Sequence, residues 1–134
     1  MIKVFLSVPM RNREKEDIEY SIRKMKRIAR AYLADNDIEA ENIEFINSII
    51  KDQPPTDVDE KIWYLGASLQ LLSKADYLIG VQDTADNPGC DLEITAFIDY
   101  KGYNKHILLP NDVILSEKEK DKKFHDLKNK ILNC

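Results

Sequence analysis

A glutamate follows a turn-forming stretch in the second half of the chain. The segment DNPGCDLEITAF, 86–97, opens with Asp, Asn, Pro and Gly, which favour turns, and continues into an apolar run that carries Glu93. One interpretation is that Glu93 lies in the first turn of a helix, complements the helix dipole and points into water. The other is that a carboxylate at a pocket edge attacks the anomeric carbon of a sugar, because it can stabilise and trap an oxocarbenium-like centre. Gly89 would let such a ligand approach the backbone closely.

Two arginines follow the first apolar segment. Arg11 and Arg13 are candidates for binding a phosphate, and Arg11 is the better placed, because a guanidinium makes bidentate contacts to phosphate oxygens. The alternative is that both arginines pair with the acidic residues of the adjoining EKED segment on a solvated surface. The chain contains neither GxGxxG nor GxxxxGK[ST], so no dinucleotide fingerprint or Walker loop supports phosphate binding.

Aromatic and cysteine side chains offer weaker candidates. Trp63 and Tyr64 fall on a predicted helix, where an aromatic is more often part of the core than a platform for a base. Cys90 has no histidine near it in the sequence to act as a base, so we do not expect a catalytic cysteine. Cys90 and Cys134 form no disulfide framework, and with the two histidines they show no metal-ligand spacing. We expect no disulfide, no metal and no cofactor.

The elements that must position these residues alternate between strands and helices. Apolar runs predict strands at 2–8, 43–50, 77–81 and 106–110. Apolar periodicity predicts helices at 14–34, 57–73, 91–101 and from 116 onward. Short apolar strands that lack alternation favour a parallel sheet with helices on both faces, which predicts a three-layer α/β fold. In such sheets ligands bind beyond the carboxyl ends of the strands, where the winding reverses, and the loops SVPMRNR and QDTADNPG occupy that edge.

The spacing of apolar residues assigns a buried face to three of these helices. For the first helix the stripe is Ile18, Ile22, Met25, Ala29 and Tyr32. For the second it is Val58, Ile62, Leu65, Leu69 and Leu72. For the last helix, which a capping box of Ser116 and Glu119 introduces, it is Phe124, Leu127, Ile131 and Leu132. Gly102 is a candidate C-cap, and the proline-containing loop 51–57 is a candidate border of the site.

Composition excludes several classes of protein. A chain of 134 residues with 43% hydrophobic residues fits one globular domain. Its net charge is −4 and no basic face stands out, so we do not expect polymeric nucleic acid as a partner. No segment approaches the ~20 apolar residues of a membrane span, and the N-terminus does not resemble a signal peptide. We therefore expect a cytoplasmic protein that does not act at a membrane.

Three segments, taken in order, resemble the nucleoside 2-deoxyribosyltransferase superfamily. They are KVFLSVPMRNRE, SLQLLSKADYLIG and NPGCDLEITAF, and the resemblance covers about 2–109. Relatives in this superfamily include deoxynucleotide N-glycosidases and an often phage-encoded branch. The resemblance implies a flavodoxin/Rossmann-like sheet of four to five strands, with 1–134 as one domain. It also implies a nucleoside or nucleotide as the small-molecule partner, and a homo-oligomer in which a neighbouring subunit completes each site.

The resemblance also assigns roles to particular residues. Glu93 matches the catalytic glutamate, and Arg11 matches an arginine in the phosphate-binding region of the nucleotide-hydrolysing relatives. Asn87 falls where a small or polar residue commonly lines the site. The substrate-binding residues expected on this basis are Phe5, Ser7, Pro9, Met10, Arg11, Ser68, Asp86, Asn87 and Gly89.

Two departures from the family pattern leave the function open. Phe5 stands where many members have a tyrosine, and Ser68 stands where the enzymes have an aspartate that assists protonation of the leaving base. A serine cannot act as a general acid near neutral pH. One hypothesis is an enzyme that cleaves or transfers at the N-glycosidic bond, and another is a non-catalytic protein that sequesters a nucleotide or a nucleotide-derived signal. A third is a sheet edge that serves assembly alone, with the last helix packed on its own domain.

Overall fold

A four-stranded parallel sheet with the strand order β2-β1-β3-β4 forms the centre of the computed structural model, which describes residues 1–133. The strands are β1 (Ile2–Leu6), β2 (Ile43–Asn47), β3 (Tyr77–Val81) and β4 (His106–Leu109). The α-helices are α1 (Lys15–Ala34), α2 (Glu60–Leu72), α3 (Pro88–Lys101) and α4 (Glu117–Leu132). The predicted alternation of strands and helices and the parallel sheet are confirmed.

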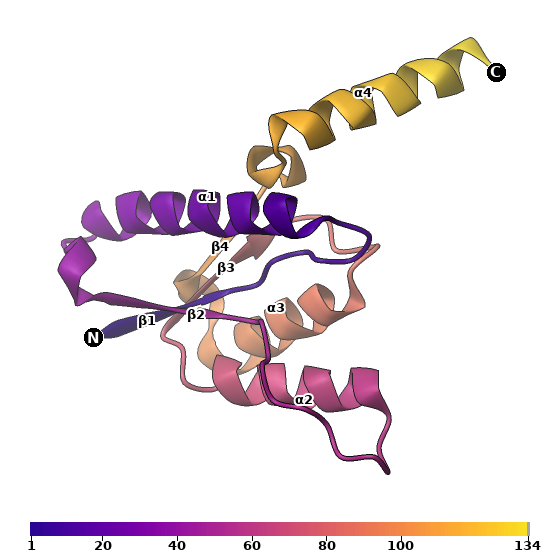
Figure 1. The fold of residues 1–134 in the computed structure, drawn as a ribbon. Helices are drawn as coiled ribbons and strands as arrows, with labels where there is room; N and C mark the ends of the chain where they lie inside the picture. Colours follow the sequence, from indigo (N-terminus) through magenta and orange to yellow (C-terminus); the bar gives the residue numbers. More distant parts are fainter. Residues whose placement is uncertain (134) are drawn as a thin grey trace.

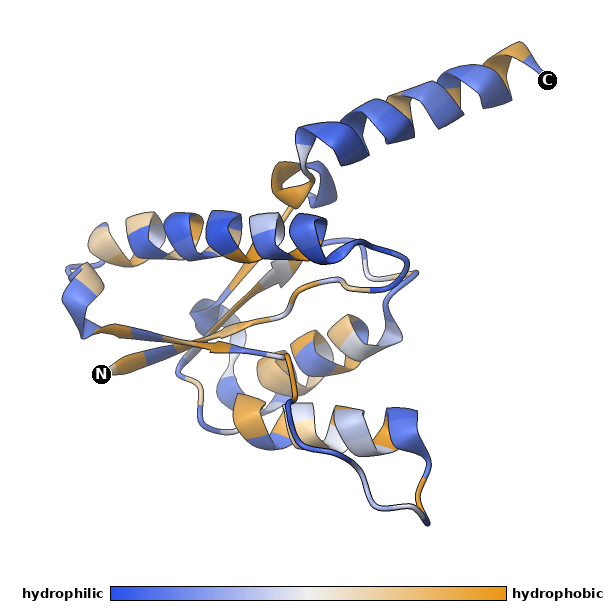
Figure 2. Ribbon diagram, in the orientation of Figure 1, coloured by the Kyte–Doolittle hydropathy of each residue, from blue (hydrophilic) through white to orange (hydrophobic). Residues whose placement is uncertain are grey.

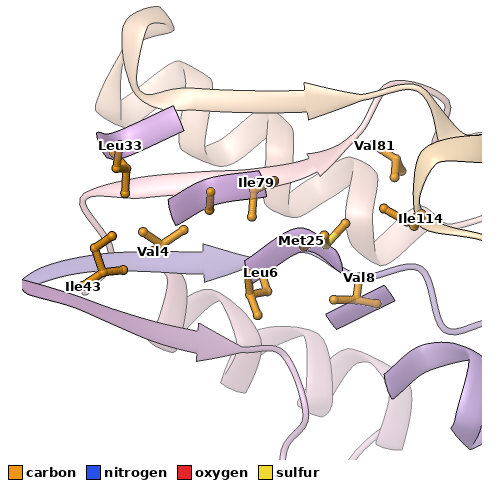
Figure 3. Close-up of a cluster of buried hydrophobic side chains, with 10 residues drawn as sticks. Val4, Leu6, Val8, Met25, Leu33, Ile43, Ile79, Val81 and Ile114 are labelled. Carbon is orange, nitrogen blue, oxygen red and sulfur yellow. The ribbon is translucent and has the colours of Figure 1, made fainter. Parts of the chain in front are cut away.

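Helices cover both faces of the sheet, so the predicted three-layer arrangement is also confirmed. Helix α1 lies on one face, and α2 and α3 lie on the other (Figure 1). On the α1 face, Val4 and Leu6 pack with Met25 in the larger core cluster (Figure 3). On the opposite face, Phe5 packs with Phe97 in a second cluster. Successive side chains of a strand point to opposite faces, so Ser7, two residues after Phe5, is directed toward α2 and α3.

The winding of the sheet reverses between β1 and β3. The chain runs from β1 outward to β2 on one side and from β3 outward to β4 on the other. Leu6 pairs with Ile79, and the backbone N–H of Ser7 donates to the carbonyl of Ile79 at 2.9 Å, which extends the ladder past the end of β1. The loops after β1 and β3 therefore leave the sheet side by side at its carboxyl edge, where a ligand site was predicted (Figure 1).

The buried face of α1 is rotated from the predicted stripe. Tyr32 is 40% exposed, whereas Leu33 is fully buried, so the prediction for Tyr32 is wrong. The polar residues Asp17 and Ser21 also lie on the buried face. Both side chains have partners there, because the Asp17 carboxylate accepts from the Ser116 hydroxyl at 2.8 Å and the Ser21 hydroxyl accepts from the guanidinium of Arg13 at 2.7 Å.

Helix α2 begins one turn later than predicted and buries a narrower face. The side chain of Asp59 caps its N-terminus by accepting from the backbone N–H of Ile62 at 3.0 Å. The inward-facing residues at its C-terminal half are Ser68 and Leu72. Val58 is 43% exposed and precedes the helix, and Ile62 in its first turn is 70% exposed, so their prediction as core residues is wrong.

Helix α4 projects away from the rest of the protein instead of packing on it (Figure 1). The predicted capping box of Ser116 and Glu119 is confirmed. The predicted packing face is wrong, because Phe124 is 70% exposed and Ile131 is 66% exposed. Figure 2 shows α4 as mostly hydrophilic, with a few isolated hydrophobic segments. Within residues 1–133, no helix has the length and apolar character that crossing a membrane requires.

Candidate functional site

Glu93 lies in the second turn of α3. The helix starts at Pro88, a residue whose fixed φ suits the first helical position, and not near Asp91 as predicted from the sequence. The effect of the helix dipole falls off beyond the first turn, so it does not explain the position of Glu93. At the other end of the helix, Gly102 has a φ of 105°, which confirms it as the C-cap.

The carboxylate of Glu93 is buried and held by two serine hydroxyls. The Glu93 residue is 4% exposed, so the interpretation in which it points into water is wrong. Ser7, from the end of β1, donates from Oγ to Oε1 at 2.8 Å. Ser68, from α2, donates from Oγ to Oε2. Each carboxylate oxygen keeps further acceptor capacity, so the group remains able to contact a ligand.

Burial controls the acidity of this group. Removal from water raises the pKa of Glu93 above its usual value, and the hydrogen bonds from Ser68 and Ser7 offset part of that rise. No cation contributes to the shift. The carboxylate is therefore stabilised only by neutral hydroxyls, and it takes up a proton at a higher pH than an exposed glutamate.

A glycine in β3 allows α3 to approach the sheet at this point. A Cβ added to Gly80 would lie 3.1 Å from Cδ1 of Ile94 and 3.5 Å from Cβ of Ser7. Ile94 follows Glu93 directly, so any side chain at position 80 would press on the turn of α3 that carries the carboxylate. The absence of a side chain at Gly80 therefore helps to bring Glu93 within hydrogen-bonding distance of Ser7.

Glu93 lies at a hollow of about 260 Å³ at the carboxyl edge of the sheet. The structure brings together six of the predicted site residues around it, which are Met10, Arg11, Ser68, Asn87, Gly89 and Glu93. They come from the loop after β1, from α2 and from the start of α3. The loop after β1 therefore meets the start of α3, as the strand order requires.

Other predicted residues do not line this hollow. Phe5 is fully buried in the core between the sheet and α3, and Ser7 reaches the site through its bond to Glu93. The carbonyl of Pro9 accepts from Arg13 at 2.6 Å on the side of α1, and Asp86 is exposed and lies outside the lining. The predicted border formed by loop 51–57 is absent from the lining.

Sequence reasoning missed several lining residues on α2. Lys61, Tyr64 and Leu65 join Ser68 along one side of the hollow. Counted from Lys61, the other three lie three, four and seven residues along the chain, which places all four on one helical face. Once Ser68 had been assigned to the site, this spacing could have identified the others. Tyr64 is half-buried and packs edge-on against Trp63, with ring centroids 5.3 Å apart, so it serves the core and also borders the hollow.

The two arginines considered for phosphate binding differ sharply. The side chain of Arg13 is largely buried and donates two hydrogen bonds of 2.8 Å to the carboxylate oxygens of Glu119 from α4. Burial alone would raise the pKa of Glu119, but hydrogen bonds from Arg13 and Ser116 outweigh burial and hold it below its usual value. Arg11 is exposed, and no ion pair engages it within residues 1–133. Only Arg11 is therefore available to a ligand.

Cys90 lines the hollow as a neutral thiol. Burial is the main cause that raises its pKa to about 11, so almost no thiolate forms near neutral pH. In the part of the chain that the structure describes, no group of three or more His, Cys, Asp and Glu side chains is arranged to hold a metal ion. Glu93 is consequently the side chain of the hollow best suited to nucleophilic attack.

Comparison with known proteins gives no match to any family model, curated protein or solved structure.

Proposed function

We propose that the protein cleaves or transfers at the N-glycosidic bond of a nucleoside or nucleotide, with Glu93 as the nucleophile. The observation that carries the proposal is the buried carboxylate of Glu93, held by Ser7 and Ser68 beside a hollow at the switch point of the sheet. A carboxylate of fixed orientation in a poorly solvated site suits a reaction with an oxocarbenium-like transition state. Resemblance to the nucleoside 2-deoxyribosyltransferase superfamily supports the same role for this residue.

In the proposed reaction, an oxygen of Glu93 forms a bond to C1′ of the sugar as the bond from C1′ to the base nitrogen breaks. The electron pair of that bond leaves with the base, which takes a proton. Water, or a second nucleoside base, then attacks C1′ and releases Glu93. Arg11 and Lys61 line the mouth of the hollow and are proposed to bind the 5′-phosphate of a nucleotide.

The leaving base needs a proton from a group other than a second carboxyl. Among the lining residues Glu93 is the sole carboxyl, and Ser68 donates its hydrogen bond to Glu93. The hydroxyl of Tyr64 borders the hollow and is the proposed donor, directly or through a water molecule.

The same shortage of acids favours a second candidate, a non-catalytic protein that binds a nucleotide. Glycosidases typically use a pair of carboxyl groups, and this hollow contains one. In that case Arg11, Lys61 and Asn87 would hold the ligand, and Glu93 would accept hydrogen bonds from the hydroxyls of the sugar.

Release of free base distinguishes the two candidates. Wild-type protein, Glu93→Gln and the control Asp99→Asn are incubated with ribo- and deoxynucleosides and with their 5′-monophosphates, and the products are separated by chromatography. Asp99 is an exposed carboxyl on α3 outside the hollow, so its loss tests the effect of removing any acid from this helix.

Base release that persists in Asp99→Asn and disappears in Glu93→Gln is the result expected of the enzyme. Glutamine keeps the shape of the side chain and still accepts a hydrogen bond, so the fold is expected to survive. Release at the parent rate by Glu93→Gln contradicts the proposed nucleophile. Binding without release by wild-type protein supports the non-catalytic candidate instead.

A further inference from the structure

A second hollow lies outside the mouth of the first. It has a volume of about 460 Å³. The two hollows share Arg11, Lys61, Leu65, Pro88 and Gly89 as lining residues. Beyond this shared boundary, Ile62 from α2 and Leu92 from α3 line only the outer hollow. The two hollows are therefore neighbours across a boundary that carries two positive charges.

The outer hollow is apolar in a part of the protein that faces water. Ile62 is 70% exposed and Leu92 is 46% exposed, and both stand next to the cations of the shared boundary. An apolar surface beside charged residues is a common mark of a binding site. We name Ile62, Leu65 and Leu92 the outer shelf.

The two cations are free to bind an anion. Neither Arg11 nor Lys61 forms an ion pair within residues 1–133, in contrast to Arg13, which is bound to Glu119. A guanidinium and an ammonium together suit two linked phosphates, the first by bidentate contacts and the second as a point charge. The order along the surface is therefore Glu93 in the first hollow, the two cations at the shared boundary, and the apolar residues in the outer hollow.

We propose that the outer shelf is a second subsite, which binds the distal ring of a dinucleotide whose two halves are joined by a diphosphate. In this arrangement the near nucleoside occupies the hollow of Glu93, Arg11 and Lys61 bind the diphosphate, and the distal base covers Ile62 and Leu92. The proposal rests on the proposed function for its placement of the near nucleoside, and it concerns binding alone.

The test compares ligands that differ only in the distal half. Calorimetry measures the affinity of Glu93→Gln, which is expected not to consume the ligand, for the four common nucleoside 5′-monophosphates and for the matching symmetric dinucleoside 5′,5′-diphosphates. For at least one base we expect the dinucleotide to bind about tenfold more tightly or better. Tenfold corresponds to about 1.4 kcal/mol, which burial of about 60 Å² of apolar surface supplies.

Removal of the apolar side chains of the outer shelf should weaken the binding of the dinucleotide but not that of the monophosphate. In Ile62→Ser combined with Leu92→Ser, we expect the dinucleotide to lose about tenfold in affinity, whereas the affinity for the monophosphate stays unchanged. The matched control is Leu127→Ser combined with Ile131→Ser on α4, where two side chains of 54% and 66% exposure lie outside both hollows. The control is expected to keep the full advantage of the dinucleotide.

Three outcomes would overturn the proposal. One is that no dinucleotide binds more tightly than its monophosphate, and another is that the shelf variant weakens both ligands equally. The third is that the shelf variant lowers the molar mass measured by light scattering, because the shelf is then an interface between copies of this chain. Base release is measured separately on wild-type protein, so a failed subsite and a failed enzymatic function give different results.

Discussion

Replacing Ser68 by alanine tests whether its hydroxyl stabilises the charged form of Glu93. The carboxylate is 4% exposed and has two hydroxyl donors, Ser7 and Ser68, so water replaces a lost donor poorly. A hydrogen bond to a charged group contributes about 1.5–3 kcal/mol to stability, against about 0.5–1.5 kcal/mol for a neutral pair. We expect Ser68→Ala to lower the free energy of unfolding by about 1.5–3 kcal/mol where Glu93 is ionised, and by about 1 kcal/mol less where it is protonated.

The direction of the pH dependence follows from the raised pKa of Glu93. The folded protein binds this proton more tightly than the unfolded chain does, whose carboxyl has the ordinary pKa of 4.5. The contribution of Glu93 to stability is therefore full below that value and declines as the pH rises through the folded pKa. Because loss of the Ser68 donor raises the folded pKa further, the decline is larger in the variant.

Urea unfolding at about pH 4 and about pH 8 measures the difference, with the fluorescence of the single tryptophan, Trp63, as the signal. The control is Ser73→Ala at the end of α2, where an exposed hydroxyl donates only to the carbonyl of Gln70. Ser73→Ala is expected to change the free energy of unfolding by no more than about 0.5 kcal/mol at both pH values. If Ser68→Ala lowers the free energy of unfolding equally at the two pH values, with the same slope against urea concentration as the parent protein, the Ser68 hydroxyl does not stabilise the charged form of Glu93.

Three further predictions concern the rest of the structure. Arg13→Met is expected to lower the free energy of unfolding by about 3 kcal/mol in urea at neutral pH, because it leaves the half-buried Glu119 without its bidentate partner. Phe124→Ala is expected to change the free energy of unfolding by less than about 0.5 kcal/mol in the same assay, whereas truncation of a buried phenylalanine costs about 3–5 kcal/mol. In a Cys134→Ser background, alkylation of Cys90 near neutral pH is expected to be roughly 100-fold slower than that of a free thiol, because its pKa is raised from 9.0 to about 11, and a mass spectrum taken over time measures the rate.

The parts of the fold that depend on local patterns were predictable from the sequence. The predicted strand 77–81 coincides with β3, because a continuous apolar run bounded by polar residues is typical of a buried parallel strand. The carboxyl edge between the loops after β1 and β3 was also predicted, since the winding rule uses only the order of the elements. Met10, Arg11 and Gly89 were expected at this edge and line the hollow there.

Contacts between distant residues account for most of the errors. Arg13 and Glu119 are 106 positions apart, and no local pattern predicts their ion pair. The buried polar side chains of α1 likewise find distant partners, since Asp17 accepts from Ser116 and Ser21 donates to the carbonyl of Ile114. The stripe on α4 predicted packing because an amphipathic pattern identifies an apolar face without identifying what covers it. Periodicity likewise gave no indication that Ile62 is 70% exposed, since exposure depends on what the rest of the fold places against the helix.

The arrangement of charge around the hollow bears on the choice between an enzyme and a binding protein. Arg11 and Lys61 stand at the mouth, whereas the carboxylate lies among neutral hydroxyls, and no cation contributes to its pKa. A protein that only held phosphates would gain nothing from this carboxylate, because a buried negative charge lowers stability and repels an anionic ligand, so a binding protein would need Glu93 to contact the hydroxyls of the sugar. A nucleophile has different needs, since poor solvation keeps a carboxylate reactive and separation from cations keeps its charge available to an oxocarbenium-like sugar. The burial of Glu93 away from the cations therefore favours chemistry at C1′ over phosphate binding alone.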